Sequence, residues 1–258
     1  MGNVKVSYRL DGQAGIITGS AGGIGKALAV GLALAGADII VADLPKQRAN
    51  AKDIAQRVRA LGRRALVVTL DVTRLPSIEA AVADSVSEFG RLDFLVNNAG
   101  VNIRKPVLDY AEDDWDKVVS VNLKGVFFCS QIAARQMVAQ KKGKIVNIAS
   151  QLATVAMRDR SIYAVTKAGV AHMAKAFALE LGPYGITVNA VGPTFVSTPL
   201  TASVFTDPQF IAENLPKIPS GRFGTTDDVV GAVRFLLSPA ADLVNGQLLL
   251  VDGGYTTW

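Results

Sequence analysis

Seven short apolar runs alternate with segments of helical periodicity, and this alternation constrains the fold more than any other feature of the sequence. Runs of this length predict buried strands, here at residues 15–18, 38–42, 65–70, 93–96, 144–148, 186–190 and 247–251. Strands that are apolar throughout and separated by helices predict right-handed strand–helix–strand units. The expected fold class is therefore α/β, a doubly wound, seven-stranded parallel sheet with helices on both faces.

Glycine follows four of the helical segments, at Gly36, Gly62, Gly90 and Gly182, where a left-handed residue commonly closes a helix. The chain has 258 residues, the size of one large domain, and it contains no linker, repeat or low-complexity tract. We therefore predict a single domain over residues 1–258.

One long connection, at about residues 192–226, interrupts the alternation between the sixth and seventh strands. Its five prolines exclude a continuous helix: Pro193, Pro199, Pro208, Pro216 and Pro219. Short helices are expected at residues 202–205 and 209–215. A connection of this length is typical of a substrate lid, and the alternative is an ordered excursion that only packs on the surface.

The charge balance is modestly basic, with 27 lysines and arginines against 22 acidic residues and a net charge of +5. The densest basic cluster comprises Arg57, Arg59, Arg63 and Arg64 and lies toward the end of a predicted helix, where cations complement the helix dipole and face solvent. We therefore expect no nucleic-acid partner, although a positive field can attract small anionic ligands.

The single cysteine, Cys129, cannot form an internal disulfide, and no histidine or cysteine stands near it at metal-ligand spacing. No metal site is therefore expected. The longest apolar stretch, residues 27–37, is too short to span a bilayer, and the first residues are polar. We expect no membrane association and a cytoplasmic location.

The sequence TGSAGGIG, residues 18–25, stands between the first strand and a predicted helix. Glycines in such a loop let a pyrophosphate approach the backbone N–H groups, although the same loop can be a tight turn with nothing bound. Asp43 follows the next strand, about 20 residues further on, where a carboxylate binds the ribose hydroxyls of NAD and repels the 2′-phosphate of NADP. Its alternative role is that of a turn residue before Pro45.

The glycine spacing T-G-x-x-x-G-x-G resembles the short-chain dehydrogenase/reductase family, and so does N-N-A-G at residues 97–100. The resemblance covers nearly the whole chain and implies a Rossmann fold and an NAD(P)-dependent oxidoreductase. NAD is expected from Asp43, and tolerance of NADP is left open.

The resemblance also implies a set of cofactor contacts. Asp71 and Val72 would hold the adenine ring, and Thr198 would hydrogen-bond the cofactor. The family usually has Pro-Gly where this chain has Pro193 and Thr194, which leaves the backbone path there open. The implied cofactor-binding residues are Gly19, Ser20, Ala21, Gly23, Ile24, Gly25, Asp43, Leu44, Asp71, Val72, Asn98, Ala99, Gly100, Tyr163, Lys167, Pro193, Thr194, Phe195, Val196 and Thr198.

Tyr163 and Lys167 are four residues apart at the start of a predicted helix, so their side chains share one face. A nearby ammonium favours the phenolate, which allows the tyrosine to exchange a proton near neutrality. Ser150, just beyond a strand, can hydrogen-bond the substrate oxygen. The resemblance adds Asn122 as the fourth catalytic residue, in a proton relay through water.

Each of these residues has a structural alternative: Tyr-x-x-x-Lys occurs by chance in helices, serine caps helices and asparagine binds backbone. Their combination with the glycine loop and N-N-A-G, in the order of the family, favours catalysis. His172 is expected to pack or face solvent, and Cys129 to lie in the core.

Arg104 follows N-N-A-G and falls at the edge of the sheet where open α/β sheets bind ligands. A guanidinium there can bind a carboxylate, whereas its alternatives are an ion pair with Asp109 or plain solvation. NIRKP, GPTFV and the ending VDGGYTTW resemble the polyol and aldonate branch of the family, especially gluconate 5-dehydrogenases. The expected substrate-binding residues are Arg104, Ser150, Gln151 and Tyr163, with Ala153 and Arg158 nearby.

The sequence thus predicts an enzyme that interconverts a secondary alcohol and a ketone on a sugar acid or sugar alcohol with NAD, most specifically gluconate and 5-ketogluconate. One alternative is a 3-oxoacyl-[acyl-carrier-protein] reductase, against which Asp43 counts; a more distant one is a nucleotide-sensing module without turnover. The resemblance implies a homotetramer, in which Trp258 either reaches a neighbouring subunit or frays.

Overall fold

The computed structural model describes residues 6–198 and 202–257. Its strands form one parallel sheet in the order β3-β2-β1-β4-β5-β6-β7, which confirms the predicted doubly wound fold. The strands are β1 (Ala14–Thr18), β2 (Asp38–Asp43), β3 (Ala65–Thr69), β4 (Phe94–Asn97), β5 (Gly143–Ile148), β6 (Ile186–Pro193) and β7 (Leu248–Val251). All seven predicted strands are confirmed, and β6 runs three residues further than expected.

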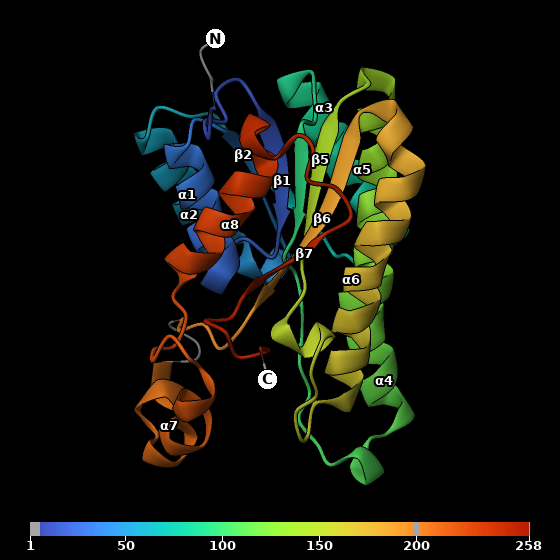
Figure 1. Cartoon of the computed structure of the whole chain (residues 1–258). Helices are drawn as coiled ribbons and strands as arrows, with labels where there is room; N and C mark the ends of the chain where they lie inside the picture. The colour runs from blue at the N-terminus through green and yellow to red at the C-terminus, as the bar shows by residue number, and fades with distance from the viewer. Residues whose placement is uncertain (1–5, 199–201, 258) are drawn as a thin grey trace.

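Helices cover both faces of the sheet (Figure 1). The helices α1 (Gly23–Leu34), α2 (Arg48–Ala60) and α8 (Thr226–Leu237) bury side chains in one hydrophobic core. The helices α3 (Leu75–Phe89), α5 (Val126–Gln140) and α6 (Ser161–Leu181) bury theirs in a second core on the opposite face. Strand residues alternate between the two cores, with Ile17 in the first and Ile16 in the second.

The predicted helix ends are confirmed at three of the four glycines. Gly36, Gly62 and Gly90 have φ values of +110°, +76° and +72°. Gly182 differs, because its φ is −52° and the chain continues into a 3₁₀ turn, η5 (Gly182–Tyr184). The left-handed residue is Gly185, where a Cβ would lie 2.7 Å from the Lys141 carbonyl oxygen. Gly185, and not Gly182, therefore ends this segment.

The long connection between β6 and α8 lies beyond the carboxyl ends of the strands, where α7 (Pro208–Asn214) stands apart from the sheet at the bottom of Figure 1. Both short helices predicted there are confirmed, as η6 (Ala202–Thr206) and as α7 with η7 (Leu215–Lys217). Pro199 and Trp258 lie outside the described residues.

Five aromatic rings hold this connection together. The Phe195 ring lies 5.2 Å from that of Phe210 and 6.0 Å from that of Tyr255, and Phe210 stacks on Phe223 at 5.7 Å. Phe205 packs edge-on against Phe223 at 5.0 Å. Aromatic pairs at these distances each contribute about 0.5–1.5 kcal/mol beyond area burial. The cluster therefore gives the connection a small core of its own.

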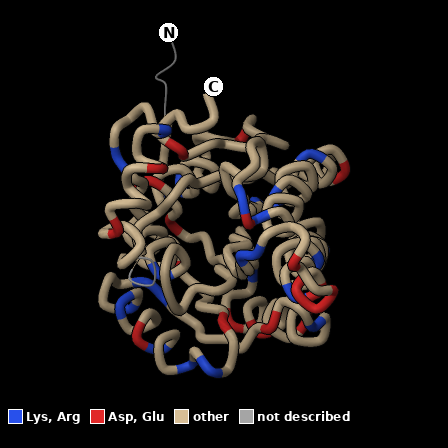
Figure 2. Tube along the Cα trace, turned by 90° about the horizontal axis from the view of Figure 1, so that it is seen from below, with Lys and Arg blue, Asp and Glu red and all other residues tan. Residues whose placement is uncertain are grey.

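Figure 2, seen from below, shows lysines and arginines interspersed with acidic residues around the molecule. In the basic cluster of the sequence, Arg57 pairs with Asp53 at 2.9 Å and Arg64 pairs with Glu88 at 2.7 Å. Among the described helices, none combines the length and hydropathy that crossing a membrane requires.

Candidate active site

The glycine loop between β1 and α1 forms a bare cradle. Gly19 and Gly23 have φ values of +64° and +52°, which favour glycine. A Cβ at Gly25 would overlap the Gly19 carbonyl oxygen and the Asn98 side chain, whereas a Cβ at Gly22 would meet open space. No side chain caps the N-terminus of α1. The first N–H groups of α1 therefore face the cradle, an arrangement that suits a phosphate.

The N-N-A-G segment after β4 braces this loop. The Thr18 hydroxyl accepts hydrogen bonds from the backbone N–H groups of Asn98 and Ala99, both at 3.0 Å. The Asn98 side-chain amide donates to the carbonyl oxygens of Thr18 and Gly19, again at 3.0 Å. The loops of β1 and β4 meet where the strand order reverses, and ligands of such sheets bind in the crevice at that point.

Asp43 ends β2 and contacts the same loop. One carboxylate oxygen accepts the N–H of Ala21 at 2.8 Å, and the other accepts the N–H of Leu44 at 2.8 Å. The side chain stays partly exposed, and each oxygen keeps a free lone pair. The carboxylate is thus fixed beside the glycine cradle with capacity to accept further hydrogen bonds.

Asp71 and Val72 follow β3 on the same edge. The Asp71 carboxylate accepts the Thr73 N–H at 3.0 Å and the Thr73 hydroxyl at 2.7 Å. Val72 packs against Gly125, where a Cβ would lie 2.9 Å from the Val72 carbonyl oxygen. These bonds fix the turn that carries both residues.

Ser150, Tyr163 and Lys167 come together between β5 and α6. Ser150 is buried, and its hydroxyl oxygen accepts the Leu152 N–H at 3.1 Å. Lys167 is buried and donates to the Ile148 carbonyl oxygen at 2.7 Å, with its ammonium 5.5 Å from the centre of the Tyr163 ring. The predicted shared face is therefore present, in a position fixed by β5.

The protonation balance differs from the expectation. Burial raises the pKa of Tyr163, while a hydrogen bond with Ser150 and the charge of Arg160 lower it. Burial also lowers the pKa of Lys167 to about 8. In the protein without a bound ligand, desolvation thus outweighs the influences that favour the phenolate. The cation that lowers the pKa of Tyr163 here is Arg160, which the sequence interpretation did not include.

Asn122 lies in a π-helical turn, η3 (Ser120–Gly125), that joins α4 (Glu112–Val119) to α5. Its side chain is buried and pairs with the backbone of Val101, accepting the N–H and donating to the carbonyl oxygen, both at 2.8 Å. A Cβ at Gly100 would lie 3.4 Å from Asn122 Oδ1 and 3.9 Å from Lys167 Nζ. The four predicted catalytic side chains therefore gather on one edge of the sheet.

A cavity of about 480 Å³, here called the carboxyl-edge cavity, opens beside this group. It lies between the loop after β4, the loop before α6 and the connection that contains α7. Its charged lining residues are Arg104, Arg158, Asp159, Arg160, Glu213 and Lys217. The alternative of an ion pair between Arg104 and Asp109 is not among the ion pairs of the described residues. Arg104 is exposed and lines the cavity, as the sequence interpretation required.

Two predicted residues are buried with unsatisfied polar atoms. Gln151 is 2% exposed, and its side-chain oxygen has no hydrogen-bond partner among the described residues. The Thr194 hydroxyl, just after β6, likewise lacks one, while its N–H donates to the Val251 carbonyl oxygen at 3.2 Å. Buried polar atoms normally have a hydrogen-bond partner, which can be a ligand or a water molecule.

The remaining predicted contacts are placed as follows. Pro193 ends β6, and Val196 forms an isolated bridge with Gly224. The Phe195 ring points into the aromatic cluster, so only its backbone is available to a ligand. His172 is exposed on α6. Cys129 is buried, and burial raises the pKa of its thiol to about 12.

The sequence interpretation missed Arg160, Lys217 and Tyr255, which line the carboxyl-edge cavity. Tyr255 lies in VDGGYTTW, which was interpreted only as a family resemblance. Arg160 precedes a predicted helix, and only its closeness to Tyr163 in the sequence could have identified it. Lys217 comes from the proline-rich connection, whose path no periodicity predicts.

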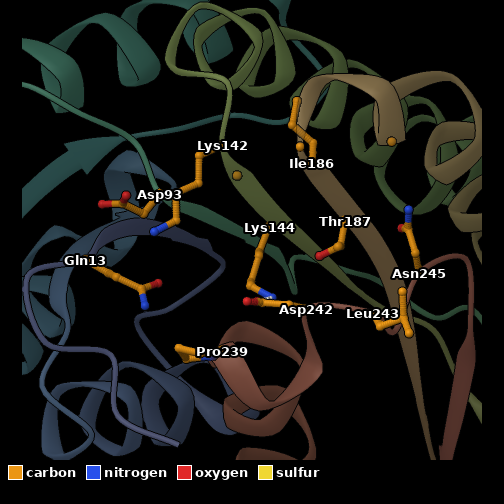
Figure 3. A pocket seen from close by; sticks show the side chains of 13 residues that line it. Gln13, Asp93, Lys142, Lys144, Ile186, Thr187, Pro239, Asp242, Leu243 and Asn245 are labelled. Carbon is orange, nitrogen blue, oxygen red and sulfur yellow. Dashed lines mark ion pairs between the residues drawn. The ribbon is translucent and has the colours of Figure 1, made fainter. Parts of the chain in front are cut away.

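A second cavity, of about 390 Å³, lies at the opposite, amino edge of the strands (Figure 3). Its charged lining residues are Asp93, Lys142, Lys144 and Asp242; Lys144 pairs with Asp242 at 2.8 Å, and Asp93 pairs with Arg91 outside the lining. This cavity is therefore close to neutral and far from the residues above. Among the described residues, no group of three or more histidine, cysteine, aspartate or glutamate side chains is placed to hold a metal ion.

Comparison with known proteins identifies relatives that match nearly the whole chain. A family model described as enoyl-(acyl carrier protein) reductase matches residues 19–256. The 2-dehydro-3-deoxy-D-gluconate 5-dehydrogenase of Escherichia coli (strain K12) is 40% identical over 250 residues, 96% of this chain and 97% of that protein. The NAD-dependent glycerol dehydrogenase of Listeria innocua is 36% identical over 250 residues, 96% of each chain.

A solved structure is equally similar. The gluconate 5-dehydrogenase from Burkholderia cenocepacia J2315, in complex with NADP and tartrate, matches with a TM-score of 0.92 and 39% identity, over 97% of this chain and 98% of that one. The fold and the gathered side chains define an oxidoreductase of the nicotinamide-dependent kind. The chain belongs to the short-chain dehydrogenase/reductase family, whose members use NAD or NADP.

Proposed function

We propose that this enzyme interconverts a secondary alcohol and a ketone on a sugar acid, with NAD as the preferred cofactor and gluconate as the most specific candidate. The observation that carries the proposal is the carboxyl-edge cavity, which is lined by three arginines, one of which, Arg160, lies close enough to Tyr163 for its charge to lower the pKa of the phenol. The substrates in the names of the relatives are consistent with it. One relative bears the name of a gluconate 5-dehydrogenase and binds tartrate, a hydroxy acid.

The residues at the cradle fit a dinucleotide. The bare glycine backbone and the uncapped start of α1 suit a pyrophosphate, and glycine at position 25 lets the loop pack closely, because a Cβ there would collide with the Gly19 carbonyl oxygen. Asp43 would accept the ribose hydroxyls, and Asp71 and Val72 would border the adenine. Lys167 would hold the second ribose, and the backbone of residues 193–196 and Thr198 would border the nicotinamide.

The Asp43 carboxylate would set the preference between NAD and NADP. Names of relatives include both an NAD-dependent enzyme and an NADP complex, so the relatives do not decide. A 2′-phosphate beside the Asp43 carboxylate would bring two anions together in a partly buried place, which is unfavourable. We therefore infer that NAD binds more tightly than NADP.

The chemistry follows from the gathered side chains. When bound, the nicotinamide dinucleotide supplies the hydride acceptor for alcohol oxidation and the hydride donor for ketone reduction. Tyr163 takes the hydroxyl proton during oxidation and returns it during reduction. Ser150 hydrogen-bonds the reacting oxygen, and Asn122 and Lys167 would link the proton to solvent through water. Arg104 would bind the carboxylate of the sugar acid.

The segment that contains α7 is proposed as the substrate lid, because Phe210, Glu213, Asn214 and Lys217 line the cavity from that side.

A homotetramer is also proposed. Its support is an apolar groove of about 490 Å³ between α5 and α6, lined by Phe127, Ala134 and Phe177 among others. A cytoplasmic location is consistent with the single buried thiol of Cys129.

Reduction of NAD or NADP by the purified protein, measured across gluconate, other aldonates, polyols and a 3-hydroxyacyl thioester, tests the proposal. We expect turnover of an aldonate with NAD, reduced by Arg104→Ala. Preference for the thioester with NADP would instead support an acyl-carrier-protein reductase. Binding of NAD without any turnover would support a nucleotide sensor.

A further inference from the structure

The carboxyl-edge cavity carries an excess of positive charge, because cationic side chains outnumber acidic ones in its lining. Four of its lining residues are cationic, and two, Asp159 and Glu213, are acidic. None of the four cations takes part in an ion pair with any described residue. Glu213 instead accepts the side-chain amide of Gln209 at 3.0 Å. The amino-edge cavity, by contrast, is lined by two lysines and two aspartates, so the excess is local to the carboxyl edge.

Arg160 is the cation closest in the chain to the catalytic tyrosine. It stands at the N-cap position of α6, three residues before Tyr163, and its side chain makes no capping hydrogen bond. Its charge lowers the pKa of both Tyr163 and Tyr255. Arg160 therefore lines the cavity and lies within electrostatic range of the catalytic tyrosine.

The position of Arg160 relative to Arg104 is fixed by a link between their loops. The Tyr110 hydroxyl lies 2.9 Å from the Ile103 carbonyl oxygen and 3.3 Å from that of Asp159. Asp159 itself adopts a left-handed backbone, with φ of +60°, which aspartate tolerates better than most residues. The loop after β4 and the loop before α6 are thus tied together beside the cavity.

The positive charges of the guanidinium groups of Arg104 and Arg160 repel each other. Burial and the charge of Arg104 lower the pKa of Arg160, and they outweigh the nearby Asp159 and tyrosines, which raise it. Arg104 is exposed and Arg160 half-buried, and both line one cavity, so their charges repel and an anion that binds between them reduces this repulsion. A carboxylate can accept two parallel hydrogen bonds from a guanidinium, so two such groups match one carboxylate well.

We propose that Arg160 is a specificity-determining residue that binds the substrate carboxylate together with Arg104 and holds positive charge beside Tyr163. This inference rests on the proposed function, because it requires a sugar-acid substrate. Two consequences follow. Loss of Arg160 weakens the binding of acidic substrates more than that of neutral ones. It also shifts the pH at which Tyr163 becomes an effective base.

The first test compares gluconate with sorbitol, a neutral polyol of the same length, in wild-type enzyme and in Arg160→Gln. We expect the KM for gluconate to rise about 10- to 100-fold, the range for losing a hydrogen bond between charged groups, and the KM for sorbitol to change less than about threefold. Arg57→Gln is the matched control, since it removes an exposed arginine of α2 that pairs at the surface with Asp53. This control should leave both KM values unchanged.

The second test is the pH profile of alcohol oxidation. The Lys167 ammonium lies 5.5 Å from the centre of the Tyr163 ring, and the charged or titratable groups that line the cavity with Arg160 are Arg104, Arg158, Asp159, Glu213, Lys217 and Tyr255. Because Arg160 favours the phenolate, Arg160→Gln should shift the rising limb of the profile to higher pH by roughly one unit. Arg160→Lys should restore the wild-type position of the rising limb, because the positive charge is kept. It should restore only part of the gluconate affinity, since lysine lacks the planar guanidinium group.

Calorimetric titration of gluconate into the NAD complex of Tyr163→Phe, with and without Arg160→Gln, measures binding where turnover is removed. Equal gluconate affinity in both proteins, or an equal rise in KM for gluconate and sorbitol, would overturn the role of Arg160. Failure of the wild-type enzyme to bind or oxidise any aldonate would instead overturn the proposed function.

Discussion

Opposing effects act on the pKa of Tyr163. Burial raises its pKa, while Ser150 and Arg160 lower it. A general base that must act near neutrality needs a net shift downward, and in the structure burial still dominates. The bound cofactor, with its cationic ring in the oxidised form, would add the missing positive charge. The protonation of Tyr163 is therefore expected to depend on the cofactor.

Tyr163→Phe tests this residue directly. General acid–base catalysis contributes about 10²- to 10⁴-fold, so kcat should fall by that factor while the fold and NAD affinity are retained. Steady-state kinetics and circular dichroism measure the two properties. An active variant would assign the proton transfer to another group.

Asp43→Asn tests cofactor choice. The amide oxygen can still accept the Ala21 N–H, so the loop should keep its conformation while the charge is removed. The ratio of kcat/KM for NADP to that for NAD should rise about tenfold or more, because the repulsion of the 2′-phosphate is lost. Asp43→Glu, which keeps the charge, serves as the control; a rise in both variants would argue against charge as the cause.

Lys167 gives the fold a defined pH dependence. Its pKa is lowered to about 8 from 10.5, so the buried ammonium destabilises the folded state below pH 8. Between pH 8 and 10.5 the folded state loses the proton while the unfolded state retains it, so this penalty is relieved as pH rises. Relative to Lys167→Met, the wild type should therefore gain about 2–3 kcal/mol of unfolding free energy over this interval. Denaturant unfolding at several pH values measures it, and a constant difference would contradict the shift.

At the level of elements, the glycine loop and the proposed lid, at about residues 192–226, are organised in different ways. The loop is fixed by backbone geometry and by the braces from Thr18 and Asn98, and its sequence pattern was sufficient to predict it. The lid is held by rings that lie far apart in the sequence, such as Phe195, Phe210 and Tyr255. No local pattern predicts such a cluster. Likewise, the π-helical turn that places Asn122 has no signature in the sequence.

Phe210→Ala tests whether the aromatic cluster holds the lid. The substitution removes ring contacts with Phe195, Phe205 and Phe223 and so frees α7. We expect the KM for substrate to rise about tenfold, the equivalent of one or two aromatic contacts, with little change in NAD affinity. Hydrogen exchange should increase over residues 202–217. Unchanged exchange there would show that other contacts hold the segment.

At the level of the whole molecule, the sheet was predictable because its strands are apolar on both faces and each is followed by a helix. The site was predictable wherever a residue belongs to a local motif, as Ser150, Tyr163 and Lys167 do. It was not predictable where charge accumulates from separate loops. Arg160 and Lys217 meet Arg104 only because the chain returns to the same edge of the sheet, and such convergence leaves no local trace.

The apolar groove between α5 and α6 concerns the assembly of whole molecules. Phe127→Glu places a charge in the groove, where a subunit interface would desolvate it. If the chain forms the proposed tetramer through this groove, light scattering should show smaller species for the variant than for the wild type. The control is Leu61→Glu, at the end of α2 on the other face of the sheet. An unchanged tetramer would place the interface elsewhere.

The central claim is that this enzyme transfers a hydride from a carbinol carbon of a sugar acid, with Tyr163 taking the proton. Incubation of gluconate deuterated at carbon 5 with NAD, followed by nuclear magnetic resonance of the reduced cofactor, tests it most directly. The account predicts one deuterium on the nicotinamide ring for each 5-ketogluconate formed, and neither product with Tyr163→Phe. Reduced cofactor without deuterium, or no reduction with any aldonate, would contradict it.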